Sequence, residues 1–219
     1  LMPEARRRAI AEIALAHDVA IVEDDVYGFL APDGPAPLSV HAPRLGHYIT
    51  SASKSMAPGL RIGFLVVPPG REANFALALR ALSWMATPLT AEVVTRWIAD
   101  GTAARLAEAR RTESMVRQRL AAEAFADFDY RAAPYAFHGW LVLPAGWRAE
   151  AFVAAAQERG VLVTPAEAFS VGPSVPQAVR ICLGGIGSRE LLVQGLAVLR
   201  ALLDRPTASD AAERYAAVV

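Results

Sequence analysis

The chain has 219 residues, enough for one large domain or two small ones with hydrophobic cores. Its formal net charge of +0 argues against a nucleic-acid or anionic-membrane surface spread over the chain, though not against a local patch. Cys182 is the single cysteine, so it cannot form an internal disulfide, and this indicates a reducing, cytoplasmic compartment. Its apolar neighbours predict a buried structural thiol without a catalytic partner. No apolar run approaches the roughly 20 residues that span a bilayer, so we expect no membrane contact.

The first part of the chain alternates between helical and strand-like segments, a pattern typical of α/β proteins. A helix is predicted over residues 3–17, because Pro3 suits a first turn and good helix formers follow it. Short apolar strands are predicted at residues 19–22, 47–50 and 62–67, the last of them buried, with a Pro-rich loop at residues 31–43. The first strand runs into an acidic cluster, Glu23-Asp24-Asp25.

Residue 71 begins a helical region. We predict a helix over residues 72–82, a second helix capped by Thr90, and a long helix over residues 102–126. Alternating charges on the long helix predict a solvated face. Beyond residue 129 the predicted strands are residues 137–143, 161–163 and 177–183, and the predicted helices are residues 148–159 and 188–203. This alternation indicates a small α+β unit with its own core.

Lys54 is the single lysine among 22 basic residues. Arginine stays protonated, whereas a lysine amine can lose its proton and attack a carbonyl. A chance survivor in an Arg-rich chain is the alternative. Lys54 follows a predicted strand, with Ser51 and Ser53 just before it and Arg61 seven residues after it. Small hydroxyl residues at a strand end are a common setting for a reactive side chain and an anion site.

Asp24 and Tyr27 follow the preceding predicted strand. Parallel α/β sheets bind ligands at the carboxyl ends of their strands, so all these side chains are expected in one crevice. Taken singly, each has a structural alternative. Asp24 could cap a turn, Tyr27 could be packing, the two serines could form turns, and Arg61 could join a surface ion pair. Their joint order and spacing favour a functional site.

The order Asp24, Tyr27, Ser51, Lys54, Arg61 resembles the Asp-x-x-Tyr, Ser-x-x-Lys and Arg pattern of the fold-type I pyridoxal-phosphate enzymes, the aspartate aminotransferase superfamily. The resemblance implies that Lys54 forms a Schiff base with the cofactor and later moves the α-proton. It implies that Asp24 keeps the pyridine nitrogen protonated, so that the ring acts as an electron sink. Tyr27 would donate a hydrogen bond to the ring oxygen.

The same resemblance implies two anion sites. Ser51 and Arg61 would bind the cofactor phosphate, with Ser53 a weaker candidate, because an arginine fork suits phosphate. Arg180, in the apolar run of residues 178–183, looks like the family arginine that grips the substrate α-carboxylate. An arginine in an apolar strand is costly to bury without an anionic partner, and a structural ion pair is the alternative. No metal site is expected.

Residues 54–63, Lys-Ser-Met-Ala-Pro-Gly-Leu-Arg-Ile-Gly, look like the branch that holds 2-aminoadipate-type aminotransferases and MocR-type regulators of the GntR family. Residues 96–102, the pair Arg110-Arg111 and residues 138–144 resemble the regulators more closely. The implied function is a pyridoxal-phosphate domain that senses an amino-acid effector for a transcriptional regulator. The alternative is a genuine aminotransferase acting on an α-amino acid of 2-aminoadipate or aromatic type. The same residues serve both functions, so transaminase activity stays open.

The fold implied is α/β: part of a pyridoxal-phosphate transferase large domain, with a mostly parallel sheet and helices, followed by a small α+β C-terminal domain. The expected boundaries are residues 1–101 for the large-domain part, 102–128 for a connecting helix, 129–205 for the small domain and 206–219 for a tail. The family's earlier half, with its phosphate turn, has no counterpart here. We therefore expect weakened cofactor affinity, exposed apolar faces, and an oligomer or a rearranged fold. The resemblance implies a homodimer, with DNA contact only through a domain upstream of these residues.

Overall fold

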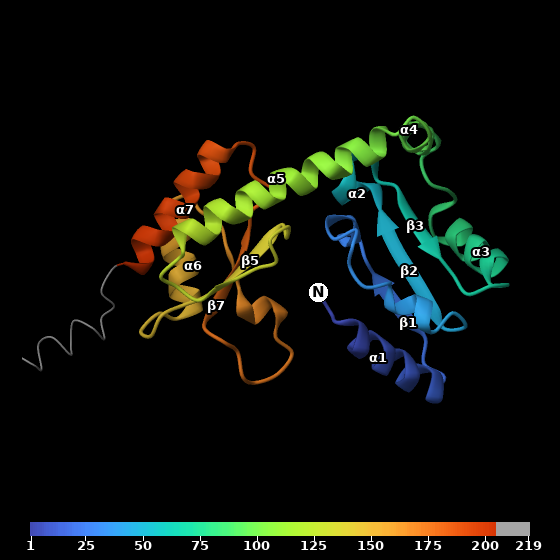
Figure 1. The fold of residues 1–219 in the computed structure, drawn as a ribbon, viewed down its shortest axis with the longest axis horizontal. Helices are drawn as coiled ribbons and strands as arrows, with labels where there is room; N and C mark the ends of the chain where they lie inside the picture. The colour runs from blue at the N-terminus through green and yellow to red at the C-terminus, as the bar shows by residue number, and fades with distance from the viewer. Residues whose placement is uncertain (205–219) are drawn as a thin grey trace, which may run out of the picture. The chain divides into compact units, whose positions relative to one another are not determined.

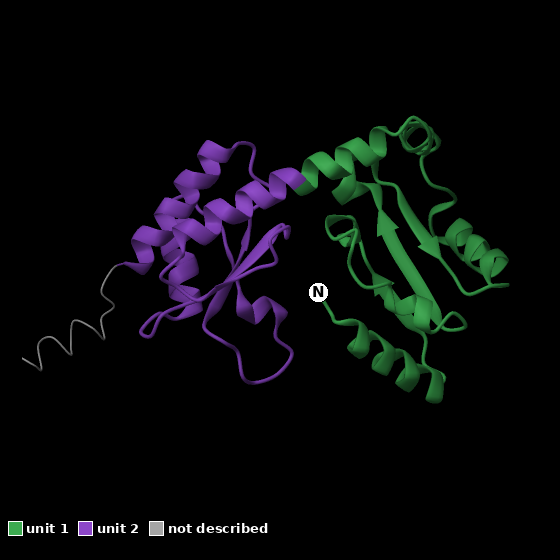
Figure 2. Ribbon diagram, in the orientation of Figure 1, with its two compact units in different colours: residues 1–111 green, residues 112–219 purple. Residues whose placement is uncertain are grey.

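The computed structural model describes residues 1–204, and the predicted tail at residues 206–219 lies outside them. The chain divides into two compact units, residues 1–111 (unit 1) and the chain from residue 112 onward (unit 2), as Figure 2 shows. Their boundary falls within one helix, α5 (Thr102–Ala124). Within the described residues, every helix is too short or too polar to cross a membrane.

Unit 1 is built around a three-stranded sheet in the order β1-β2-β3 (Figure 1). The strands are β1 (Ile21–Asp24), β2 (Gly46–Ser51) and β3 (Gly63–Val66). β1 and β2 are parallel, whereas β2 and β3 are antiparallel. The mostly parallel sheet that we expected is therefore parallel at one of its two pairings. The helices of this unit are α1 (Glu4–Ala16), α2 (Ala52–Ser55), α3 (Glu72–Ser83) and α4 (Pro88–Ala99), with 3-10 turns η1 (Gly28–Leu30), η2 (Leu38–His41) and η3 (Pro58–Leu60).

Unit 2 holds a four-stranded antiparallel sheet in the order β4-β5-β7-β6. Its strands are β4 (Tyr130–Arg131), β5 (His138–Val142), β6 (Thr164–Pro165) and β7 (Ala178–Cys182). Its other elements are α6 (Ala149–Gln157), the 3-10 turn η4 (Ala166–Phe169) and α7 (Arg189–Leu203). The core joins the sheet to α5, α6 and α7 through buried side chains that include Phe125, Leu141, Phe152, Val179 and Leu199. This confirms the prediction of an α+β unit with its own core.

Two predicted element positions are wrong. Thr90 was expected to cap a helix, but α4 already begins at Pro88, and the Thr90 hydroxyl donates a hydrogen bond to the Thr87 carbonyl, 3.2 Å away. Proline is well suited to a first helical turn, so it starts the helix earlier than the threonine would. The strand expected at residues 161–163 forms at β6 instead, because β7 pairs with Thr164 and Pro165. By contrast, Ser188 caps α7 by accepting the Leu191 N–H.

The strand expected to be buried, β3, is exposed at all four residues. Val66 on β3 and Val22 on β1 are 61% and 66% exposed, respectively. Helix α3 contains no buried residue, and Leu82 is 87% exposed. The sequence shows that these side chains are apolar, but only the tertiary structure decides whether another layer covers them. The expectation of exposed apolar faces in unit 1 is therefore met.

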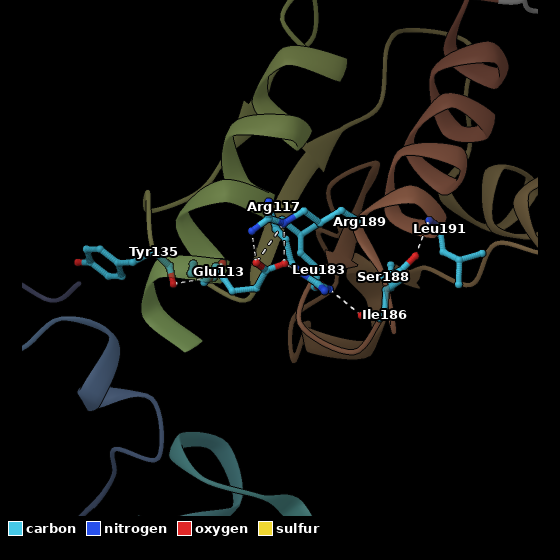
Figure 3. A network of polar contacts seen from close by, with 10 residues as sticks. Glu113, Arg117, Tyr135, Leu183, Ile186, Ser188, Arg189 and Leu191 are labelled. Atoms are coloured by element: carbon cyan, nitrogen blue, oxygen red, sulfur yellow. Dashed lines mark hydrogen bonds and ion pairs between the residues drawn. The ribbon is translucent and has the colours of Figure 1, made fainter. Parts of the chain in front are cut away.

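The charged face of α5 is not fully solvated as expected. Arg117 is buried and its Nη1 donates to the carbonyl oxygens of Leu183 and Ile186, at 2.7 and 2.8 Å. Its Nε donates to Glu113, which also accepts hydrogen bonds from Arg189 (Figure 3). The hydrogen bond from Arg189 and then that from Arg117 outweigh burial and lower the pKa of Glu113 to about 2. These charges therefore tie α5 to the turn that begins α7.

Candidate functional site

The first two strands of unit 1 end at the same edge of the sheet. β1 and β2 run parallel, with Asp24 paired to Ile49, so the carboxyl ends of both strands lie together. Asp24 is exposed, and its Oδ1 accepts the N–H of Val26 at 3.3 Å. The Asp24 carboxylate therefore closes a turn, which is the structural alternative considered for it, and it also remains accessible to solvent. The predicted site residues of both strands begin at this edge.

Lys54 and Tyr27 come together here from different strands. Lys54 lies on the short helix α2 directly after β2, and Tyr27 lies in the loop after β1. The Lys54 Nζ is 5.5 Å from the centroid of the Tyr27 ring, a distance at which an ammonium is attracted to an aromatic face. Both residues are exposed. An amine and a phenol thus share one accessible corner of the sheet edge.

The loop that carries Tyr27 is shaped by Asp25 and Gly28. A Cβ added at Gly28 would lie 2.2 Å from Oδ2 of Asp25, so a larger residue here would require the Asp25 side chain to move. The same Oδ2 accepts the hydroxyl hydrogen of Tyr48 at 3.0 Å. Burial, followed by this hydrogen bond, raises the pKa of Tyr48 to about 12. Sequence reasoning missed these contacts, which hold the loop in place.

Glu23 also has a structural role. Its carboxylate accepts the backbone N–H groups of Leu38 and Ser39, each at 2.9 Å, and pairs with Arg7 at 2.8 Å. Burial opposes ionisation of Glu23, yet these donors outweigh it and lower its pKa. Within the acidic cluster, Glu23 and Asp25 therefore support the fold, and Asp24 carries the exposed carboxylate.

Ser51 and Ser53 flank the start of α2. Ser51 occupies the position before the helix, in extended conformation, but its side chain makes no capping hydrogen bond. Its carbonyl oxygen accepts a hydrogen bond from the Ser55 hydroxyl at 3.4 Å. Ser51 and Ser53 are both half-buried. The Ser51 hydroxyl is thus not used for helix capping.

Arg61 has an unusual backbone conformation. Its φ of 54° and ψ of 33° place it in the left-handed region, where a side chain other than glycine costs about 1–2 kcal/mol. The guanidinium is exposed and forms no ion pair with any residue between 1 and 204, so the ion-pair alternative is not realised there. A strained arginine with a free charge is a feature that a bound anion would explain.

Arg110 anchors the C-terminal end of the Lys54 segment, by which we mean α2 and the Met56 that follows it. Its Nε and Nη2 donate to the Met56 carbonyl oxygen, at 3.0 and 2.5 Å. Beneath the segment, Ala52, Met56, Ile62 and Val94 form a small buried cluster. Sequence reasoning noted Arg110 only as a motif residue, because its partner lies 54 positions away and cannot be read from spacing. It acts here as a positioning residue for α2.

Arg180 lies in unit 2, half-buried on β7. Its Nη2 is 3.5 Å from Thr164 Oγ1, and its guanidinium carbon is 4.7 Å from the centroid of the Phe169 ring. Its Nε is buried and has no hydrogen-bond partner within the described part of the chain. No carboxylate among residues 1–204 pairs with Arg180, so the structural ion pair considered as an alternative is absent from them.

Cys182 differs from its prediction. It is exposed rather than buried, because it is the last residue of β7 and its side chain points away from the core. It lies directly across the sheet from His138, a partner that spacing did not indicate. A hydrogen bond with His138 lowers the pKa of the Cys182 thiol to about 7, against an opposing contribution from burial.

The side chains at the unit 1 edge suit a particular kind of ligand. They offer an amine, a carboxylate, a phenol and hydroxyls, together with a guanidinium that has no anionic partner in the described part of the chain. An amine can engage an aldehyde, a carboxylate can hold a protonated ring nitrogen, and a guanidinium binds phosphate bidentately. A phosphorylated aromatic aldehyde therefore fits the residues present.

The sequence of this chain is similar to those of a known protein family and of its members. Residues 1–198 match the family Aminotransferase class I and II. The chain is 33% identical over 204 residues to the uncharacterized HTH-type transcriptional regulator YdeF of Bacillus subtilis (strain 168), covering 93% of this chain and 44% of that protein. The chain thus spans about half the length of this relative.

Solved structures of aminotransferases share the fold. The multiple substrate aminotransferase of Thermococcus profundus matches with a TM-score of 0.81 at 20% identity, over 92% of this chain and 52% of that one. A Pyrococcus horikoshii kynurenine aminotransferase in complex with PMP matches with a TM-score of 0.79 at 24% identity, over 93% and 53% of the two chains. This likeness shows the fold, and the match over residues 1–198 shows that the chain belongs to the class I and II aminotransferase family.

Proposed function

We propose that this chain is the pyridoxal-phosphate-binding, amino-acid-sensing domain of a MocR-type transcriptional regulator. One observation carries the proposal: the Lys54 Nζ lies 5.5 Å from the centroid of the Tyr27 ring near the carboxyl ends of two parallel strands, the first of which ends at the exposed Asp24. Members of the class I and II family are typically dependent on pyridoxal phosphate. When bound, this cofactor supplies an aldehyde and a ring that withdraws electrons from bonds at an amino-acid α-carbon.

Each residue has a distinct task in this proposal. Lys54 provides the amine that engages the cofactor aldehyde and carries a proton to and from the α-carbon. Asp24 holds a proton at the pyridine nitrogen, and Tyr27 donates a hydrogen bond to the ring oxygen. The exposed guanidinium of Arg61, with the Ser51 hydroxyl and more weakly that of Ser53, binds the phosphate.

Arg180 binds the carboxylate of the amino acid. The support is its unpaired charge on an apolar strand and its buried Nε without an acceptor among the described residues. A guanidinium in such a setting gains more from a carboxylate than an exposed arginine does. We further propose a cytoplasmic homodimer, with DNA contact through a domain outside residues 1–219.

The regulator is favoured over an enzyme by the similarity to YdeF, which extends over 93% of this chain. The second candidate is an aminotransferase acting on an α-amino acid of 2-aminoadipate or aromatic type, favoured by the aminotransferase structures that share the fold. The same side chains serve both functions. Amino-group transfer to a 2-oxo acid at more than one turnover per site would favour the enzyme, whereas amino-acid-dependent DNA binding without turnover would favour the regulator.

The test of cofactor binding is chemical trapping in the complete gene product. We expect borohydride reduction after addition of pyridoxal phosphate to leave a pyridoxyl group on Lys54. Trypsin then fails to cleave after Lys54 and releases one peptide spanning residues 45–61, between Arg44 and Arg61. Mass spectrometry of that peptide locates the adduct without measuring any activity.

Lys54→Arg is the matched control, because it retains the positive charge and the tryptic site but removes the nucleophilic amine. The variant should give no adduct in the segment and should lose the absorbance of bound cofactor. Equal labelling of the wild type and the variant would refute the proposal. The 219-residue chain by itself should give a weak adduct, in keeping with the family half that it does not contain.

A further inference from the structure

The sheet of unit 2 has one face in the core and one face outside it. On β7, Val179 and Ile181 are 0% and 5% exposed and belong to the core. Side chains alternate along a strand, so Arg180 between them points to the opposite face. The strand registers place Trp140 of β5 and Thr164 of β6 directly beside it on that face. Arg180 therefore stands in the middle of a short row formed by three strands.

Phe169 lies against this row from η4, the turn that follows β6. Its ring centroid is 4.7 Å from the guanidinium carbon of Arg180 and 6.1 Å from the ring centroid of Trp140, which meets it edge-on. Phe169 is 48% exposed, so its ring is not held there by burial in the core. The rings of Phe169 and Trp140 lie against Arg180 in this way, and we call these two rings the aromatic support.

The aromatic support leaves the donors of Arg180 available. A ring stacked on a guanidinium face restricts its orientation without using any N–H group, because those groups lie in the guanidinium plane. Only Thr164, at 3.5 Å, approaches an N–H group, and Nε has no acceptor among residues 1–204. The charge is thus oriented by an apolar contact, although no anion among the described residues fixes it.

We infer that Phe169 is a positioning residue that holds the Arg180 guanidinium ready for a carboxylate, an inference that rests on the proposed role of Arg180. An arginine already fixed in orientation loses less conformational freedom when the ligand binds. Removal of the ring should therefore weaken the binding of amino acids about fivefold to tenfold. It should not affect a ligand that lacks the carboxylate.

The experiment compares Phe169→Leu with the conservative Phe169→Tyr in the complete gene product loaded with pyridoxal phosphate. The twenty amino acids are screened by the absorbance change of the bound cofactor, and the tightest one becomes the probe. The control ligand is the amine that has the same side chain as this amino acid but lacks the α-carboxylate. We expect Phe169→Leu to raise the Kd of the amino acid but not that of the amine. Phe169→Tyr keeps an aromatic ring, so the Kd of the amino acid should stay close to the wild-type value.

A matched control variant comes from a second stack in the same unit. The guanidinium carbon of Arg200 lies 4.9 Å from the Phe128 ring centroid, but Arg200 also pairs with Asp127 and Asp204. Phe128→Leu makes the same chemical change at an arginine that already has anions. It should leave the ratio of amino-acid to amine affinity unchanged.

A second readout is independent of any ligand. In the 219-residue chain, the ¹⁵Nε–Hε resonance of Arg180 can be assigned by its loss in Arg180→Lys. We expect its order parameter to fall in Phe169→Leu and to be retained in Phe169→Tyr. An unchanged order parameter, or an equal loss of amino-acid and amine affinity, overturns the inference.

The outcomes separate this inference from the proposed function. If Arg180→Gln leaves amino-acid affinity unchanged, or if none of the twenty amino acids changes the cofactor absorbance, the proposed function fails. If Arg180→Gln weakens binding but Phe169→Leu does not, only the positioning role of Phe169 fails.

Discussion

Arg61 combines a strained backbone with an exposed charge. Its left-handed backbone lies between the turn η3 and β3, and Ile62, the next residue, is buried. The Ile62 carbonyl oxygen also accepts the N–H of Ala52 at 3.0 Å, which anchors the turn to the Lys54 segment. The fold therefore keeps the strained backbone in place, and the Arg61 guanidinium remains exposed.

Substitution of Arg61 separates these two effects. Arg61→Gly removes both the strain and the charge, whereas Arg61→Ala removes the charge alone. We expect the glycine variant to be more stable than the alanine variant by about 1 kcal/mol, as measured by thermal unfolding. Both should weaken the binding of pyridoxal phosphate by the complete gene product about tenfold or more. Equal melting temperatures for the two variants would argue against backbone strain.

At this scale, the sequence predicts which chemical groups are present but not what holds them. Lys54 and Tyr27 could be placed at neighbouring strand ends from their order alone, and the structure brings them together. The contacts of Arg110 and Phe169 could not be predicted, because both join distant segments of the chain. Cys182 was misread for the same reason: its partner His138 is adjacent only across the sheet.

Among the elements, α5 carries a charged side that the structure partly buries. Arg117 links α5 to the carbonyl oxygens of the segment before α7, and Glu113 joins Arg117 to Arg189 (Figure 3). The carboxylate is 34% exposed, so solvent screens part of its interaction with the two arginines. The network therefore adds polar contacts between two helices that also meet in the hydrophobic core of unit 2.

The low pKa of Glu113 makes this connection sensitive to acid. The pKa of about 2 is below the ordinary 4.5, so the stabilisation is complete above about pH 4.5 and is lost as pH falls toward 2. With screening taken into account, we expect Glu113→Gln to destabilise unit 2 by about 1 kcal/mol at pH 7. That difference should disappear near pH 2. Urea unfolding at both pH values, with hydrogen exchange of α7 amides to assign the change to unit 2, measures it.

Glu108→Gln is the control for this prediction. Glu108 also pairs with an arginine of α5, Arg111, but its side chain is 58% exposed. Exposed pairs of this kind contribute little, so the change should be below about 0.5 kcal/mol at either pH. If Glu113→Gln were no more harmful than Glu108→Gln, the network would have no structural role.

Element types were easier to predict than burial. The long helices and the strands with continuous apolar runs were found close to their observed bounds, because periodicity and composition are local properties. β6 was displaced because a strand of two residues is defined by its pairing with β7 rather than by its own sequence. β3 was expected to be buried, but an apolar run does not reveal whether another layer covers it.

At the scale of the whole molecule, the most notable feature is the large apolar surface that unit 1 exposes to solvent. Helix α3 and the segment after it expose large hydrophobic side chains: Leu77, Leu79, Leu82, Trp84, Met85 and Leu89. Monomeric soluble proteins rarely expose so many together. The 219-residue chain should therefore associate with itself at micromolar concentration.

Polar substitution on α3 tests this expectation. The double change Leu77→Gln and Leu82→Gln alters side chains that are 69% and 87% exposed, so it should leave unfolding within about 0.5 kcal/mol of wild type. We expect a clear shift toward monomer in sedimentation equilibrium. Leu162→Gln, at a residue that is 78% exposed in unit 2, should have no such effect. Association that is unaffected by the α3 changes would place the contact elsewhere.

The exposed position of Lys54 makes the 219-residue chain unusually simple to label. Its one side-chain amine lies on the surface of α2, beside Tyr27. Amine-directed reagents have only Lys54 and the chain terminus to react with, so one modification reports on one place. A bound aldehyde would protect that amine, and the rate of acylation at Lys54 then becomes a direct gauge of ligand occupancy.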